Sequence, residues 1–136
     1  MEQREALRLA LVERAKEARK NSYCPYSGFA VGAALLCADG RVFTGCNVEN
    51  AAYGSTICAE RTALLKAVSE GCRTGWVALA VAGSGEDFCW PCGACRQMLY
   101  EFAPGLRVLA ARSDGDFREA MLSELLPHAF GPESLE

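Results

Sequence analysis

Apolar residues recur at helical spacing in four segments of the chain. Residues 2 to about 20 carry charges between five apolar side chains that fall on one side, which is typical of a surface helix: Leu7, Ala10, Leu11, Ala15 and Ala18. Residues 59–69 repeat the pattern and end before Gly71, which suits a glycine stop. A third helix is predicted from about Pro91 to Phe102, because proline fits the first helical position. The tail carries a short helix around Leu125 and Leu126.

Continuous apolar runs separate these helices. Residues 29–37 and 41–48 flank the pair Asp39-Gly40, which is a strong signal for a β-hairpin. Residues 76–82 and 106–111 form two more strands, and the helix between them provides the crossover that parallel neighbours require. The tight turn at 113–115 predicts that a fifth strand around Phe117 runs antiparallel to the fourth. The pattern therefore predicts an α/β domain with a mixed sheet and helices on its faces.

Composition adds limits on size and partners. A length of 136 residues favours one domain over 1–136, since about 100 to 200 residues make a domain; residues 131–136 are expected to be mobile. The 14 basic and 17 acidic residues leave no positive excess for nucleic acid or for an anionic membrane. We expect no export signal, and no apolar run reaches the length of about 18 residues that indicates a membrane span. These features predict a cytoplasmic protein.

Eight cysteines and one histidine are the unusual part of the composition. In a reducing compartment, clustered cysteines more often indicate metal binding or chemistry than cross-links. Cys92 and Cys95 form a CxxC pair at the start of one predicted helix, and Cys58 lies at the start of another, where the positive helix end favours thiolates. The three sulfurs can converge on one metal ion, with the Glu60 carboxylate two residues beyond the first ligand.

Three protein ligands leave the fourth position of a tetrahedral zinc ion open, which is the pattern of a catalytic site. Zinc with three thiolates carries a net charge of about −1, which weakens its acidification of water unless a cation lies close. Arg61, beside Glu60 on the same turn, is the candidate to donate to the sulfurs.

The residues alone leave alternatives open at this cluster. Cys89 could complete a structural zinc site, and Cys92 with Cys95 could be a redox pair. Glu60 could be an ordinary acidic residue of a first helical turn, and Arg61 could form a surface ion pair. Four cysteines outside the cluster are interpreted as small packing residues: Cys24, Cys37, Cys46 and Cys72. The single histidine, His128, is interpreted as a partly exposed residue.

Segments 58–63 (CAERTA) and 91–97 (PCGACRQ) together resemble the zinc signature of the cytidine deaminases, specifically the small homotetrameric class. Segments 26–35, 47–53 and 125–132 are similar to the same family in the same order, so the resemblance covers residues 23–132. It implies a three-layer α/β/α fold with a mixed five-stranded sheet and one zinc ion per subunit. It also implies hydrolytic deamination of cytidine and 2′-deoxycytidine to the uridine forms, with release of ammonia, in pyrimidine salvage.

The resemblance implies roles for residues at the cluster. Cys58, Cys92 and Cys95 correspond to the zinc ligands. Glu60 corresponds to the proton shuttle, which takes a proton from water and delivers it to N3 of the pyrimidine. The backbone around Ala59 would face the base.

The resemblance also implies a substrate pocket and shared sites. Asn47 and Glu49 correspond to residues that hold the ribose hydroxyls, and Phe29 to the aromatic residue that packs against the nucleoside. Tyr53 lies in the stretch that lines the sugar pocket and the subunit contact. Phe130 resembles a phenylalanine that reaches a neighbouring subunit's site, so a homotetramer with composite active sites is expected.

Several rivals share part of this pattern. A blasticidin S deaminase would have the same scaffold but is expected to lack the Asn47-Val48-Glu49 clamp, and a deoxycytidylate deaminase would ordinarily carry histidine at the Cys58 position. Editing of nucleic acid is disfavoured by the acidic charge. A non-catalytic zinc-stabilised interaction module predicts four protein ligands, whereas a redox protein predicts a reversible disulfide and no stoichiometric zinc.

Overall fold

Five strands form one mixed sheet in the computed structural model, which describes residues 2–135. Their order is β2-β1-β3-β4-β5, and their bounds are β1 Val31–Cys37, β2 Val42–Cys46, β3 Trp76–Gly83, β4 Arg107–Ala111 and β5 Phe117–Met121. β1 is antiparallel to both β2 and β3, β3 and β4 are parallel, and β5 is antiparallel to β4. The predicted hairpin, parallel pair and antiparallel fifth strand are confirmed.

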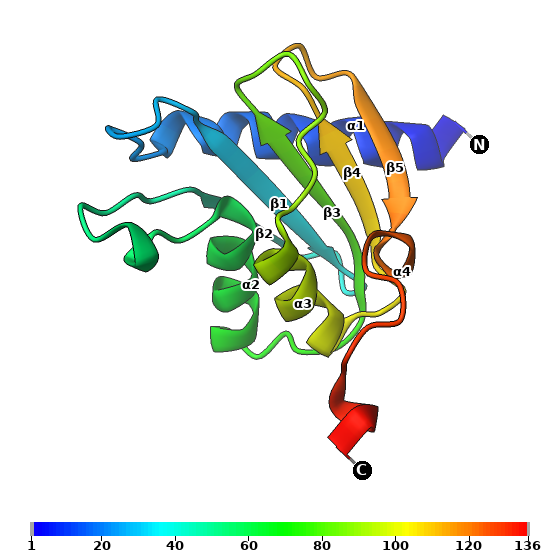
Figure 1. The fold of residues 1–136 in the computed structure, drawn as a ribbon. Helices are drawn as coiled ribbons and strands as arrows, with labels where there is room; N and C mark the ends of the chain where they lie inside the picture. Colours follow the sequence, from blue (N-terminus) through cyan, green and yellow to red (C-terminus); the bar gives the residue numbers. More distant parts are fainter. Residues whose placement is uncertain (1, 136) are drawn as a thin grey trace.

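Helices cover both faces of this sheet and give the molecule three layers (Figure 1). α1 (Glu2–Ala18) crosses one face, and α2 (Ala59–Ser69) and α3 (Gly93–Phe102) lie on the other. The remaining helical segments are short: α4 Leu122–Leu125, η1 Arg19–Asn21, η2 Tyr53–Ser55 and η3 Pro132–Leu135. The α/β/α fold expected from the sequence is therefore confirmed. None of the helices in residues 2–135 combines the length and apolar character that a membrane crossing needs.

Small residues set the distance between the helices and the sheet. Beneath α1, the sheet presents mainly alanine side chains: Ala34, Ala80, Ala82 and Ala111. A Cβ atom added to Gly32 of β1 would lie 1.9 Å from the carbonyl oxygen of Ala15 in α1. On the other face, a Cβ atom on Gly45 of β2 would lie 2.5 Å from the carbonyl oxygen of Ala59 in α2. Glycine at these two positions lets helix backbone rest directly on strand backbone.

The apolar stripe predicted for α1 is partly wrong. Leu7 is 61% exposed, and the buried residues of the helix are Leu11, Val12 and Ala15. Leu7 lines an open groove between α1 and the sheet, together with Leu36, Val77 and Leu109, so its side chain is not covered as those of the following turns are.

The predicted bounds of the strands and of α1, α2 and α3 agree with the structure to within two residues, whereas the short tail helix, predicted around Leu125 and Leu126, lies at Leu122–Leu125. Differences of two residues occur at both starts and ends of elements: α3, for example, begins at Gly93 and not at Pro91, because Cys92 is its extended N-cap residue. In the tail, residues 132–135 form the turn η3. The predicted mobility of 131–136 stays a prediction, and residue 136 lies outside the described residues.

Candidate metal centre and surrounding pocket

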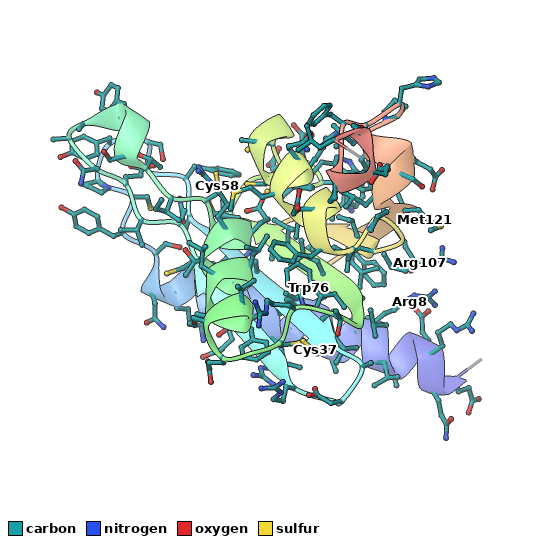
Figure 2. All side chains as sticks on the ribbon, turned by 90° about the horizontal axis from the view of Figure 1, so that it is seen from below. Arg8, Cys37, Cys58, Trp76, Arg107 and Met121 are labelled. Atoms are coloured by element: carbon teal, nitrogen blue, oxygen red, sulfur yellow. The ribbon has the colours of Figure 1, made fainter. Side chains whose placement is uncertain are left out.

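Three cysteine sulfurs converge where α2 and α3 begin, at the position labelled Cys58 in Figure 2. The Sγ atoms of Cys58 and Cys92 are 3.9 Å apart, those of Cys92 and Cys95 are 3.4 Å apart, and all three lie within 4.8 Å of one another. Cys58 and Cys92 are the N-cap residues of α2 and α3, both with extended backbone. Their sulfurs therefore lie beside unpartnered helix N–H groups and the positive ends of two helix dipoles.

This arrangement fits one zinc ion. A tetrahedral zinc with Zn–S distances of about 2.3 Å holds its sulfurs about 3.8 Å apart. The Sγ distances of 3.9 Å and 3.4 Å lie close to that value. Hydrogen bonds, first from Cys95 and then from Arg61, lower the pKa of the Cys58 thiol to about 5, so it is a thiolate at neutral pH. The same contact with Cys58, with burial, raises the pKa of Cys95, whose proton metal binding would displace.

Arg61 provides the positive charge beside the sulfurs. Its Nη2 atom donates to Cys58 Sγ at 3.5 Å and to the carbonyl oxygen of Thr56 at 3.2 Å. The hydrogen bond to Cys58 raises the pKa of Arg61 above its usual value. The Nε atom of Arg61 is buried without a hydrogen-bond partner among the described residues. The guanidinium is thus held at the sulfur cluster, and not on the surface where a simple ion pair would place it.

Glu60 is a buried carboxyl group beside the cluster. Its side chain belongs to the first turn of α2, and the residue is only 5% exposed. Burial, with a smaller contribution from the Cys58 charge, raises the pKa of Glu60 to about 7. A carboxyl group with a pKa near neutrality can both accept and release a proton, which is the property required of an acid–base catalyst.

Cys89 lies outside the sulfur cluster. Burial, and then the nearby Glu60 charge, raise the pKa of the Cys89 thiol to about 12. Within residues 2–135, the three-cysteine cluster is the one group of acidic, histidine or cysteine side chains arranged to hold a metal ion. This geometry favours a three-ligand site over the alternative with four ligands.

Asn47 and Glu49 lie beyond the end of β2, and both organise nearby backbone. The buried Asn47 amide accepts from the N–H of Val31 at 2.9 Å and donates to the carbonyl oxygen of Phe29 at 2.8 Å. Glu49 accepts from the backbone N–H groups of Tyr26 and Ser27, both at 3.0 Å, and from the Ser27 hydroxyl. These bonds, led by the hydroxyl, hold the pKa of Glu49 below its usual value. Glu49 is therefore a fixed carboxylate at neutral pH.

Glu49 opens onto a cavity of about 300 Å³. Its lining contains two aromatic residues and several hydrogen-bonding groups: Tyr26, Ser27, Glu49, Asn50, Tyr53 and Thr56. The rings of Tyr26 and Tyr53 meet edge to face, with centroids 5.9 Å apart. The sequence had singled out only Glu49 and Tyr53 here. Ser27 could not be recognised as the partner of Glu49, because 22 residues separate them and the loop must fold back.

The remaining predicted residues lie at separate places. Ala59 is the first residue of α2, so its backbone N–H has no partner within the helix. The Phe29 side chain is 41% exposed and lies over Gly83 and Gly85 at the end of β3. Phe130 is 58% exposed in the tail, and its carbonyl oxygen accepts a 2.7 Å hydrogen bond from Gln97 of α3. No role was predicted for Gln97, whose side chain ties the tail to the helix that carries Cys95.

Comparisons with known proteins agree with this geometry. Residues 6–111 match the family described as the cytidine and deoxycytidylate deaminase zinc-binding region. The chain is 50% identical over 126 residues to a cytidine deaminase from Sporosarcina psychrophila, covering 92% of each protein. A crystal structure of cytidine deaminase from Burkholderia pseudomallei is 51% identical, with a TM-score of 0.86 over 89% of this chain and 97% of that one.

A crystal structure of cytidine deaminase from Mycobacterium tuberculosis is 43% identical and matches with a TM-score of 0.78, covering 90% of this chain and 95% of that one. The family match and these relatives extend over both helix starts that carry the sulfur cluster. This chain belongs to the cytidine and deoxycytidylate deaminase family.

Proposed function

We propose that the protein is a zinc-dependent hydrolase that converts cytidine and 2′-deoxycytidine to uridine and 2′-deoxyuridine with release of ammonia, a reaction of pyrimidine salvage. The observation that carries this proposal is the buried Glu60 carboxyl group beside three convergent cysteine sulfurs. The relatives that match most of the chain are cytidine deaminases by name.

The proposed chemistry divides between the metal and the protein. When bound by Cys58, Cys92 and Cys95, zinc acts as a Lewis acid that makes water a nucleophile near neutral pH. Glu60 takes a proton from the attacking water and delivers it to N3 of the ring, while the water oxygen attacks C4. Glu60 then carries the second water proton to the departing amino group, so that ammonia leaves. Arg61 offsets the negative charge of the thiolates.

We assign nucleoside binding to residues around this centre. The fixed Glu49 carboxylate accepts hydrogen bonds from ribose hydroxyls, and the Asn47 side chain contributes to the same clamp. The Phe29 ring packs on the nucleoside, and the free backbone N–H at Ala59 donates to the base. The exposed faces of Phe29 and Glu49 leave these side chains accessible to a ligand.

We further propose a homotetramer in the cytoplasm, with the single domain 1–136 as subunit. Tyr53 is 76% exposed and Phe130 is 58% exposed, so both side chains are accessible to a neighbouring subunit. We assign Tyr53 to a subunit contact and Phe130 to the active site of a neighbouring subunit. A reducing compartment suits the protein because metal binding requires three reduced thiols. Sedimentation that found an active monomer would contradict the role of Phe130.

The test is zinc stoichiometry measured alongside turnover. We expect about one zinc per chain and loss of ultraviolet absorbance with cytidine and deoxycytidine, but not with cytosine, deoxycytidylate or blasticidin S. Glu60→Gln should lower kcat by about 10²- to 10⁴-fold with zinc retained, the usual range for a general acid–base catalyst. Glu70→Gln, at the exposed C-terminal end of the same helix, is the matched control. Full activity of Glu60→Gln would refute the assignment.

A further inference from the structure

The Phe29 ring rests on a turn that contains two glycines. A Cβ atom added to Gly83 would lie 2.8 Å from Phe29 Cζ, and one added to Gly85 would lie 3.0 Å from Phe29 Cε1. Any side chain at either position would therefore move the ring. We call residues 83–85 the Phe29 platform.

Hydrogen bonds join the platform to the backbone next to Phe29. The N–H of Ser84 donates to the carbonyl oxygen of Ala30 at 2.9 Å, and Ser84 Oγ accepts from the N–H of Ala30 at 3.0 Å. The Asn47 amide bonds to Phe29 and Val31, the residues on either side of Ala30. These hydrogen bonds hold the backbone that carries the Phe29 ring against the platform.

Arg19 holds the platform from the opposite side. Its Nη1 atom donates to the carbonyl oxygen of Gly83 at 2.8 Å, and its Nη2 atom donates to the carbonyl oxygen of Ser113 at 3.0 Å. The N–H of Ser113 in turn donates to the carbonyl oxygen of Gly85 at 3.0 Å. Arg19, Gly83, Gly85 and Ser113 therefore form a closed ring of contacts between the end of α1, the loop after β3 and the β4–β5 turn. The loop and the turn lie side by side in Figure 1.

Arginine suits this position for a geometric reason. The planar guanidinium presents two N–H groups in a fixed fork, so one side chain can bind two carbonyl oxygens at once. Lysine carries its charge at one atom and cannot span both oxygens with the same rigidity. The backbone of Arg19 is itself held close to the sheet, because a Cβ atom on Gly32 would lie 2.5 Å from the Arg19 nitrogen.

We propose that Arg19 is a positioning residue for nucleoside binding, acting through the Phe29 platform to set the height and tilt of the Phe29 ring. This inference rests on the proposed function, in which Phe29 packs on the nucleoside. Arg19 makes none of the contacts at the three sulfurs, so its effect falls on substrate binding and leaves the metal in place.

The experiment compares Arg19→Met and Arg19→Lys with the wild-type zinc enzyme, using cytidine. We expect Arg19→Met to raise KM about tenfold and to change kcat by less than about threefold, with zinc content unchanged. The KM of Arg19→Lys should lie between that of Arg19→Met and that of the wild type. Arg41→Met is the matched control, because Arg41 also donates to a carbonyl oxygen, that of Glu70, but at an exposed site away from the platform.

A second variant reaches the ring without altering Arg19. Gly85→Ala should raise KM in the same direction, whereas Gly105→Ala, where an added Cβ meets nothing within 4 Å, should not. Gly85→Ala keeps the test decisive if Arg19→Met fails to fold. The proposal is overturned if the Arg19 variants lose thermal stability with KM unchanged, or if Gly85→Ala binds cytidine as the wild type does. A wild-type protein that binds zinc but does not deaminate cytidine would instead overturn the proposed function and this inference with it.

Discussion

Replacing Gly45 by alanine should displace α2 and thereby misplace Cys58 and Glu60. The new Cβ atom would lie 2.5 Å from the carbonyl oxygen of Ala59 and 2.6 Å from the backbone nitrogen of Ala63. Both contacts are with helix backbone, which cannot rotate away as a flexible side chain could. Ordinary contact begins at 3.4 Å, so α2 must retreat from β2 by about 1 Å.

This displacement should lower both the stability of the protein and its turnover. Overpacking of this kind typically lowers the free energy of unfolding by about 1 to 3 kcal/mol. A 1 Å misplacement of catalytic groups can lower turnover by about a hundredfold. Because Cys58 caps α2 and Glu60 lies in its first turn, both would move with the helix while Cys92 and Cys95 stay with α3. We therefore expect weaker zinc binding as well as a lower kcat.

Urea unfolding, zinc stoichiometry and kcat should be measured on the same preparation of the Gly45→Ala protein. Gly105→Ala is the control, since Gly105 has no atom within 4 Å of an added Cβ and lies in the connection from α3 to β4. It should keep wild-type stability, zinc content and kcat. Wild-type kcat and zinc content in the Gly45→Ala protein would refute the reasoning that backbone contact at β2 positions the metal centre.

Three further predictions concern charge and backbone strain. Arg61→Met should weaken zinc binding by about 10- to 100-fold, because the thiolates lose the cation that bonds to Cys58; competition with a chromophoric chelator measures this, and unchanged affinity would contradict it. Ser27→Ala should raise the pKa of Glu49 toward its usual value, so the rise of KM at acid pH should begin at a higher pH than in the wild type; identical pH profiles of KM would exclude this role of the hydroxyl. His128→Gly should raise the free energy of unfolding by up to about 1 kcal/mol in urea, because His128 has a φ of 54°; a less stable variant would show that the histidine side chain outweighs the strain.

Local sequence signals were sufficient for the elements and for the positions of the thiolates. The Asp39-Gly40 turn and the proline before Cys92 act on their immediate neighbours, so they could be interpreted without knowing the rest of the fold. Cys58, Cys92 and Cys95 lie at helix starts. The parallel pair β3–β4 requires its crossover helix, α3, to begin beyond one end of the sheet. Convergence of the sulfurs followed from these local rules and the strand order.

Contacts between distant loops could not be predicted in the same way. Arg19 binds the carbonyl oxygen of Gly83 across 64 residues, and an arginine near the end of a surface helix has no sequence feature that marks such a partner. The resemblance assigned Asn47 to the ribose, but no local signal indicated that its buried amide also accepts a hydrogen bond from the backbone of Val31 in β1. These contacts depend on how the loops meet above the sheet, and hydrophobic periodicity carries no information about that.

The charge of the metal centre explains why its polar groups must be considered together. Zinc with three thiolates sums to about −1, and an ionised Glu60 would bring the buried site to about −2. The Arg61 guanidinium, bonded to Cys58 with its Nε atom buried, reduces this excess. Glu60 remains only 5% exposed beside negative sulfur, which favours its neutral form and the uptake of a proton. The geometry that makes the site able to hold zinc thus also gives Glu60 the proton affinity that a proton shuttle requires.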